Sequence, residues 1–176
     1  SPWRMLEILS EGSMPWSQCA LFQVDERIAP TGSPERNLTH LVLSLPLACQ
    51  AAIRPMPVGA RDLEDAASTY EYSLPGHLDL VHLGPGPDGH TASLVPDDPV
   101  LEVTDRRIAV TGTEYQGTHR MTMTYPVFEN ARKILFLVTG AEKREALDRL
   151  LAGDGTIPAG RVETANATLI TDIAPD

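Results

Sequence analysis

The amino-acid sequence predicts an α/β fold built on an open, mostly parallel sheet. Three short apolar runs, at residues 19–24, 78–83 and 134–138, have the length and composition of strands that are buried on both faces. Segments with helical spacing lie between these runs, and such alternation is typical of a parallel sheet with helices packed against it. Each run ends in charged or glycine-rich residues, and open α/β sheets bind ligands beyond the carboxyl ends of their strands. The three ends are therefore expected to meet at one site.

Three segments are predicted to be helices because their apolar residues recur at helical spacing and their ends carry suitable start and stop residues. They are 2–9, with Met5, Leu6 and Leu9 on one face; 62–74, with an acidic first turn; and 141–151, with Leu147, Leu150 and Leu151 on one face and Gly153 beyond its end. Residues 107–111 and 121–125 are further strand candidates, and the stretch 28–37, rich in Pro and Gly, is a predicted loop. No stretch has the composition of a linker, so residues 1–176 are predicted to form a single domain.

Composition and charge exclude several classes of protein. The apolar fraction of 42% and the charged fraction of 22% are those of a soluble globular domain, and no run of 18 apolar residues is present to span a membrane. The net charge of −10 argues against a general nucleic-acid binder, which needs a basic face. Cys19 and Cys49 form no disulfide or metal-binding pattern and are expected to be core residues. No targeting segment opens the chain, and we expect a cytoplasmic protein.

The strongest local signal is the run Gly84-Pro-Gly-Pro-Asp-Gly-His-Thr91, which follows the second predicted strand. Its glycines match the spacing of a dinucleotide-binding turn, and its length matches a P-loop with His90 in the place of lysine. Both nucleotide-binding motifs aim backbone N–H groups at phosphates, but Pro85 and Pro87 have no N–H, and Asp88 would set a carboxylate beside the phosphates. The run therefore favours another chemistry.

Asp88 and His90 lie together at this strand end, and two interpretations stay open on these residues alone. In the first, the run is a stiff turn that exposes a histidine. In the second, the carboxylate orients the imidazole and favours its charged form, which makes His90 a candidate general base near neutral pH. His82, inside the apolar run, is by contrast expected to be a core histidine whose hydrogen bonds are satisfied.

Cationic residues near the other strand ends indicate an anion site. Lys143 falls in the first turn of a predicted helix, where a cation opposes the helix dipole unless an anion binds there. Arg120, which opens the strand candidate at 121–125, is a second candidate anion clamp because its fork of N–H donors suits phosphate. The run Asp25-Glu26-Arg27, taken alone, is best explained as an ordinary charged strand end. The sequence contains no G-x-S-x-G elbow, no H-E-x-x-H motif and no paired C-x-x-C motif.

Four segments together resemble the 6-phosphogluconolactonase family, in their order and spacing as well as in their residues. The resemblance covers nearly the whole chain and is carried by Val24-Asp-Glu-Arg27 with Asn37 after a Pro-rich loop, Leu83-Gly-Pro-Gly-Pro-Asp-Gly-His-Thr-Ala-Ser-Leu94, Arg120-Met-Thr-Met-Thr-Tyr-Pro126 and Phe136-Leu-Val-Thr-Gly-Ala-Glu-Lys143. It implies a Rossmann-like open, mostly parallel sheet with helices on both faces, a fold shared with glucosamine-6-phosphate deaminases. It also implies hydrolysis of 6-phospho-D-glucono-1,5-lactone to 6-phosphogluconate, in the oxidative pentose phosphate pathway, without a metal or cofactor.

The resemblance also implies roles for the matched residues. His90 is the catalytic acid/base with Asp88 beside it, and Asp25 and Arg27 line the reacting end of the substrate. The residues that would bind the substrate and its phosphate are Arg120, Lys143, Ser1 and Asn37. A lactone is an activated ester, so water, a base and a partner for the developing oxyanion suffice to open it. We expect a monomer whose partner is a small sugar phosphate.

Two features depart from the family pattern. Pro85 stands where the family usually has an apolar residue. Family chains also begin with a further helix and strand that lead into a Gly-Gly-Ser-Thr-Pro phosphate loop, of which only Ser1-Pro2 is present here. The chain is therefore expected to be truncated at its N-terminus relative to the family.

Two alternative functions remain. An amino-sugar phosphate deaminase or isomerase of the same fold would carry Asp-Glu-Tyr where this chain has Asp25-Glu-Arg27. It would also carry an Ala-Phe-Asn run after the histidine, where this chain has Ala92-Ser-Leu94. A non-catalytic sugar-phosphate sensor is the alternative from another class, and such proteins usually have a DNA-binding appendage that this sequence does not show.

Overall fold

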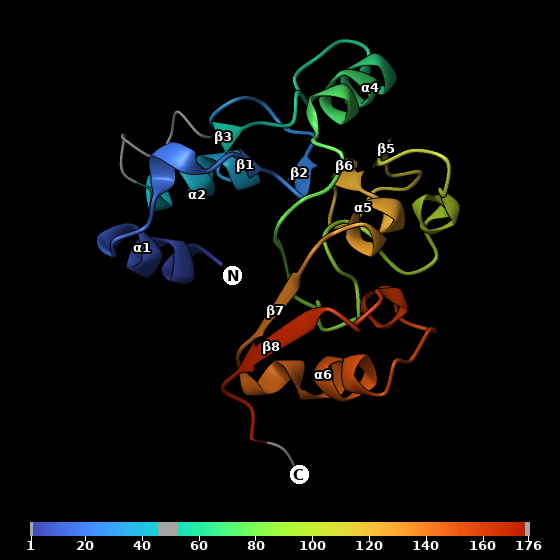
Figure 1. Ribbon diagram of the computed structural model, residues 1–176. Helices are drawn as coiled ribbons and strands as arrows, with labels where there is room; N and C mark the ends of the chain where they lie inside the picture. The colour runs from blue at the N-terminus through green and yellow to red at the C-terminus, as the bar shows by residue number, and fades with distance from the viewer. Residues whose placement is uncertain (1, 46–52, 175–176) are drawn as a thin grey trace.

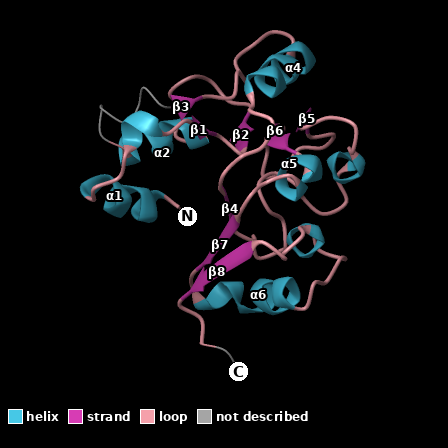
Figure 2. Ribbon diagram, in the orientation of Figure 1, coloured by secondary structure: helices cyan, strands magenta, loops and turns pink. Residues whose placement is uncertain are grey.

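The computed structural model describes residues 2–45 and 53–174, and it confirms the predicted α/β class (Figures 1 and 2). Its strands are β1 Leu21–Phe22, β2 Asp25–Arg27, β3 Ile53–Arg54, β4 Val81–Leu83, β5 Ile108–Val110, β6 Arg120–Met123, β7 Ile134–Val138 and β8 Ala167–Thr171. Its α-helices are α1 Trp3–Glu11, α2 Asn37–Ser44, α4 Leu63–Ser73, α5 Tyr125–Glu129 and α6 Arg144–Leu151. Short 3-10 helices are η1 Trp16–Gln18, η2 Pro99–Glu102, η3 Ala141–Lys143 and η4 Pro158–Arg161.

The strands form three small sheets within the described residues. β1 pairs with β3, and β4–β7–β8 form a second sheet; all of these pairs are parallel. The third sheet, β2–β6–β5, is antiparallel. Figure 1 shows α6 lying along β7 and β8. The parallel pairing brings the carboxyl ends of β4 and β7 together, which is the arrangement the candidate site needs.

A large apolar core joins β4, β5, β6 and β7 to α4, α5 and α6, and a smaller cluster around Ile53 packs β1 and β3 against α1 and α2. β7 alternates buried and partly buried residues, and its inner side chains Ile134, Phe136 and Val138 are in the same cluster as Leu147 and Leu150 of α6. β6 is buried along its whole length. Each of these positions removes apolar surface from water, the main stabilising term of the fold.

The first predicted strand, 19–24, is shorter than expected because the chain changes partner within it. Leu21 and Phe22 pair in parallel with β3, whereas Asp25–Arg27 is itself a strand that pairs antiparallel with β6. The charged run is therefore a strand of its own, paired with β6, and not the end of the first strand. The second predicted strand, 78–83, is reduced to β4 because pairing with β7 starts at Val81. Cys19 is only partly buried, and Cys49 lies outside the described residues.

The predicted helix at 141–151 is divided in two. Gly140 has a φ of 95°, and the Lys143 amide donates to the Gly140 carbonyl in a tight turn, so η3 precedes α6. Leu147 and Leu150 are buried as predicted, but Leu151 is 66% exposed, so its placement on the buried face was wrong. α4 lies within one residue of its predicted range at each end, whereas α1 continues two residues beyond its predicted end at Leu9. The Asp62 carboxylate caps α4 by accepting from the amides of Glu64 and Asp65.

Some elements carry no local signal in the sequence. α2 begins at Asn37 inside a Pro-rich stretch, and its N-cap Arg36 makes no side-chain cap. The buried Glu26 carboxylate caps this helix from the neighbouring strand instead, by accepting from the amides of Asn37 and Leu38 at 2.7 and 2.9 Å. The predicted strand at 121–125 ends at Met123, and Tyr125 opens α5.

Candidate active site

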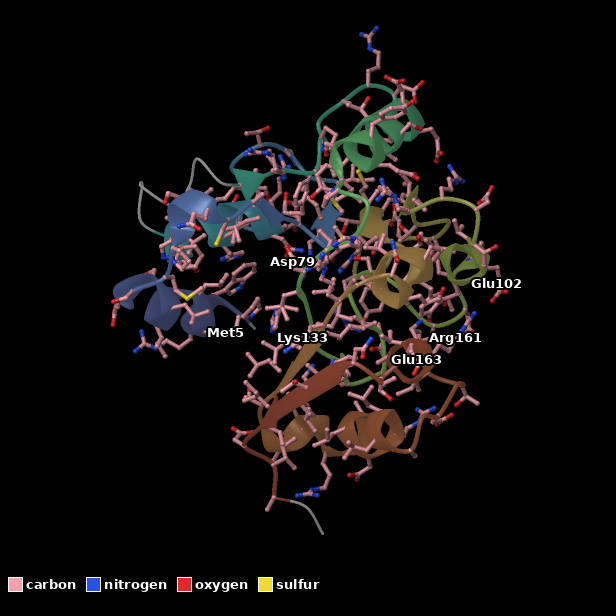
Figure 3. All side chains as sticks on the ribbon, in the orientation of Figure 1. Met5, Asp79, Glu102, Lys133, Arg161 and Glu163 are labelled. Atoms are coloured by element: carbon pink, nitrogen blue, oxygen red, sulfur yellow. The ribbon has the colours of Figure 1, made fainter. Side chains whose placement is uncertain are left out.

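A cavity of about 230 Å³ lies at the carboxyl ends of β4 and β7. Its wall includes Asp25, Gly84–Gly86, His90 and Lys143. The three segments that the sequence singled out therefore meet in one place, as predicted from the rule that open α/β sheets bind ligands at strand ends. A larger cavity of about 340 Å³ lies elsewhere, beside η2 and η4, which carry Glu102 and Arg161 (Figure 3), and none of the predicted site residues lines it.

His90 and Asp88 form the central contact of the site. The Nδ1 atom of His90 lies 2.5 Å from Asp88 Oδ1, and the His90 amide donates to the same oxygen at 3.2 Å. A carboxylate beside Nδ1 holds the proton on that nitrogen and leaves Nε2 as the atom available to a ligand. Burial by itself would raise the pKa of Asp88, but the hydrogen bond and charge of His90, together with a hydrogen bond from Tyr115, outweigh it and lower the pKa below 3.8. Asp88 is therefore an ionised partner for the imidazole at neutral pH.

The ring of His90 occupies space that is free because residue 86 is a glycine. A Cβ atom added at Gly86 would overlap the Cε1 and Nδ1 atoms of His90, so the ring lies directly against the Gly86 backbone. The Gly86 amide donates to the His90 carbonyl at 2.7 Å, and Gly89 takes a φ of 83° between them. The turn is thus shaped around His90, which favours the functional interpretation of the Gly/Pro run over a turn that exposes a histidine by chance.

Asp25 reaches the cavity from β2. Because side chains alternate along a strand, Asp25 and Arg27 share one face of β2, while Glu26 points to the other. The Asp25 carboxylate accepts from Ser93 Oγ at 2.7 Å and from Asn37 Nδ2 at 3.0 Å. Burial raises the pKa of Asp25 above 3.8, although Ser93, Arg120 and His90 act in the opposite direction. The carboxylate is therefore rigidly held at the cavity wall.

Lys143 approaches the same cavity from the other side. It occupies the N-cap position of α6 without a capping hydrogen bond, and its Nζ donates to the Pro85 carbonyl of the glycine-rich loop at 2.8 Å. Burial lowers the pKa of Lys143, opposed by the negative charges of Glu142 and Asp88. Three N–H donors are available on an ammonium group, so the contact with Pro85 leaves donors for a bound anion.

Arg120, Arg27 and Asn37 are not among the residues that line the cavity. Arg120 is 3% exposed, donates to Tyr115 O and Gln116 Oε1, and lies with its guanidinium 4.9 Å from the Tyr115 ring centroid. Arg27 donates to the Glu35 carbonyl. Asn37 contacts Asp25, and Ser1 lies outside the described residues. These arginines add positive charge near Asp25, but the cationic group on the cavity wall is Lys143.

The structure corrects the expectation for His82 and adds residues that the sequence did not point to. His82 is partly buried and lines the cavity, and its buried Nε2 has no hydrogen-bond partner among the described residues, so it is not the satisfied core histidine that was expected. Burial lowers its pKa. Ser93 lies within the motif quoted above, so the motif could have found it. Tyr115, which contacts both Asp88 and His90, belongs to no motif.

This arrangement suits acid–base chemistry on a small anionic substrate. An imidazole with a free nitrogen, a carboxylate and an ammonium group surround a cavity large enough for a compact ligand. Among the residues that the structure describes, no helix is long and apolar enough to cross a membrane, and no group of three or more His, Cys, Asp or Glu is placed to hold a metal ion.

The chain is similar in sequence to the proteins of one family. Residues 1–171 match the family model described as glucosamine-6-phosphate isomerases/6-phosphogluconolactonase. The chain is 38% identical to a 6-phosphogluconolactonase of Synechocystis sp. over 86% of its own length and 68% of the relative's. It is 31% identical to a 6-phosphogluconolactonase of Rattus norvegicus over 90% of its length and 66% of the relative's. The chain thus spans about two thirds of the length of these relatives.

Solved structures are similar over almost the whole chain. A 6-phosphogluconolactonase from Thermotoga maritima matches with a TM-score of 0.84 and 28% identity, over 97% of this chain and 80% of the other. A monomeric glucosamine-6-phosphate deaminase matches with a TM-score of 0.76 and 20% identity, over 97% and 80%. At that identity the second match bears on the fold alone.

Proposed function

The chain belongs to the glucosamine-6-phosphate isomerase/6-phosphogluconolactonase family, and on that premise we propose that it hydrolyses 6-phospho-D-glucono-1,5-lactone to 6-phosphogluconate in the oxidative pentose phosphate pathway. The observation that carries the proposal is the contact between Asp88 and His90, since His90 lies on the wall of a cavity that Lys143 also lines. The proposal includes a cytoplasmic, monomeric enzyme, and gel filtration and cell fractionation test those two points.

In the proposed reaction, His90 acts as the base and then as the acid. Its Nε2 takes a proton from water, and the water oxygen attacks the carbonyl carbon of the lactone. When the tetrahedral intermediate collapses, the bond from carbon to the ring oxygen breaks, and the imidazolium returns the proton to that oxygen. Asp88 stabilises the imidazolium in between, since it is ionised and in contact with Nδ1.

Asp25 and Lys143 orient the substrate in the cavity and add charge beside it. The Asp25 carboxylate, held by Ser93 and Asn37, faces the cavity and accepts hydrogen bonds from water or from a substrate hydroxyl. Lys143 binds the phosphate, which anchors the lactone beside His90 and makes the attack effectively intramolecular. Arg27 and Arg120 add positive potential from behind Asp25 without a place on the cavity wall.

A direct assay tests the proposal. Freshly prepared 6-phosphogluconolactone hydrolyses by itself, so the rate with protein must exceed the buffer rate, and 6-phosphogluconate must be the product. Release of ammonia from glucosamine 6-phosphate without lactone hydrolysis would contradict the proposal in favour of the deaminase alternative. Binding of sugar phosphate without turnover of either substrate would favour the non-catalytic alternative.

We expect the activity to be unaffected by a chelator. An activated ester needs only a base and charged partners, which His90, Asp25 and Lys143 provide. The measurement is the initial rate before and after treatment with a chelator, with no metal added. Loss of the rate on chelation and its recovery with zinc would contradict a metal-independent mechanism.

Replacing Lys143 by alanine is expected to weaken use of the phosphorylated lactone by about 10- to 100-fold in kcat/KM, which corresponds to loss of a charged hydrogen bond. The effect is expected mainly in KM if the contact serves ground state and transition state alike. Unphosphorylated gluconolactone should lose much less, because it has no phosphate to bind. Inorganic phosphate should also inhibit the variant less than the wild type.

The matched control is Lys133→Ala. Lys133 is exposed and immediately precedes β7 (Figure 3), so its replacement should leave both substrates unaffected. Equal losses on the phosphorylated and plain lactones with Lys143→Ala would mean that Lys143 serves the glycine-rich loop through its bond to Pro85, and not the phosphate.

A further inference from the structure

We propose that Tyr115 is a positioning residue of this site, which fixes the Asp88 carboxylate and the His90 ring in the arrangement that proton transfer needs. This inference rests on the proposed function, since it assigns a part to a residue of the same site. It concerns a side chain that lies outside every motif of the sequence.

The contacts of Tyr115 join it to both members of the pair. Its hydroxyl lies 2.9 Å from Asp88 Oδ2 and 3.2 Å from His90 Nδ1, while Asp88 Oδ1 lies against the same Nδ1. The hydroxyl therefore donates to the carboxylate and is within reach of the Nδ1 proton as an acceptor. The Tyr115 ring also meets the His90 ring edge to face, with centroids 5.2 Å apart. Three contacts thus limit rotation of the imidazole.

The fold holds Tyr115 in place. Tyr115 and Thr118 face each other across a two-residue turn, in which Gln116 and Gly117 both have positive φ, at 55° and 81°. This turn closes the hairpin between β5 and β6, and such turns match the natural twist of paired strands. Arg120, at the base of the turn, donates to the Tyr115 carbonyl and covers the face of its ring at 4.9 Å. The buried Arg120 thus holds the Tyr115 side chain next to Asp88 and His90.

The charged groups around Asp88 and His90 keep the Tyr115 hydroxyl protonated. Asp25 acts electrostatically on His90, Lys143 on Asp88, and Arg120 on Tyr115, while Arg27 acts on Arg120. Burial raises the pKa of Tyr115, as do the hydrogen bond and charge of Asp88, against the effect of Arg120. Tyr115 is therefore a protonated donor at neutral pH. By donating to Asp88, it takes up part of the negative charge that would otherwise stabilise the imidazolium.

The test is Tyr115→Phe, which removes the hydroxyl and keeps the ring. Loss of a hydrogen bond to a charged group is expected to lower kcat about 10-fold and to leave KM nearly unchanged. The acid limb of the pH profile of kcat/KM is expected to move to higher pH. The sign follows because Asp88, without the hydrogen bond from Tyr115, stabilises the imidazolium more strongly. Loss of the longer contact between the hydroxyl and Nδ1 acts in the other direction, but the charge-assisted bond to Asp88 is the stronger of the two.

Two tyrosine controls separate positioning from folding. Tyr72 is 94% exposed, so Tyr72→Phe should change nothing. Tyr70 is buried and its hydroxyl bonds the carbonyls of Gln23 and Arg54, so Tyr70→Phe should lower the melting temperature without moving the pH profile. A Tyr115→Phe enzyme with the wild-type kcat and pH profile would overturn the inference, as would a change in KM or melting temperature alone.

The two proposals fail in different ways. A wild-type protein without activity above the buffer rate would overturn the proposed function. In that case the NMR signals of the His90 ring still test Tyr115, because the pH at which they change should be higher in Tyr115→Phe than in the wild type. Coincident curves for the two proteins would overturn the inference about Tyr115 whatever the activity.

Discussion

Replacement of His90 by alanine is expected to lower kcat by roughly 10²-fold or more and to change KM far less, because the imidazole acts in the transition state. The two carboxylates near His90 cannot take over its role. Asp88 is ionised and is oriented towards the missing ring, and Asp25 is held by Ser93 and Asn37 in a fixed position. The measurement is the steady-state rate on fresh 6-phosphogluconolactone after subtraction of the buffer rate.

The control for this variant is His77→Ala, at an exposed histidine in the loop before β4. It should retain the wild-type rate, and both variants should melt close to the wild type because neither residue is fully buried. A His90→Ala enzyme within a few-fold of wild type would make His90 a structural residue of the glycine-rich turn and would remove the base from the proposed mechanism.

Gly86→Ala is expected to lower kcat nearly as much as the loss of His90 itself, by about 10²-fold. The added methyl group would occupy the space of His90 Cε1 and Nδ1 and would lie 2.8 Å from Asp88 Oδ1, so the ring and its contact with Asp88 must shift to admit it. A shift of this kind breaks the geometry on which proton transfer depends. The backbone of Gly86 does not have a positive φ, so the expected cause is the collision with the ring and not strain in the turn.

A double-mutant cycle shows whether the effect passes through His90. If Gly86→Ala acts by displacing the ring, then adding it to His90→Ala should cost almost nothing further. The matched substitution Gly76→Ala, where no atom lies within 4 Å of the added Cβ, should leave the rate unchanged. Additive losses in the cycle would instead indicate that Gly86→Ala disturbs the loop as a whole, including the carbonyl of Pro85 that Lys143 binds.

The sequence by itself determined the α/β class, the helix at α4 and the meeting of three strand ends at one site. These predictions depend on signals between near neighbours in the chain. The apolar run at 134–138 became β7 without change, the Asp62 carboxylate caps the two amides that follow it closely, and His90 contacts Asp88 two residues earlier. Contacts between residues this close in the chain follow from their spacing, so the sequence pattern was enough to predict them.

Only the tertiary structure decided which contacts form between residues that are far apart in the sequence. Glu26 caps α2 across 11 residues of chain, and Tyr115 reaches Asp88 across 27. Neither contact has a local pattern, because the first depends on how the chain returns from β2 to the start of α2, and the second on where the turn between β5 and β6 meets the loop after β4. The pairing of β6 with β2 and β5 also buries Arg120 against the Tyr115 ring, and Arg120 is not among the residues of the cavity wall, where the sequence suggested a phosphate clamp. A side chain's spacing in the sequence fixes which face of a strand it occupies, but the pairing of strands fixes what that face meets.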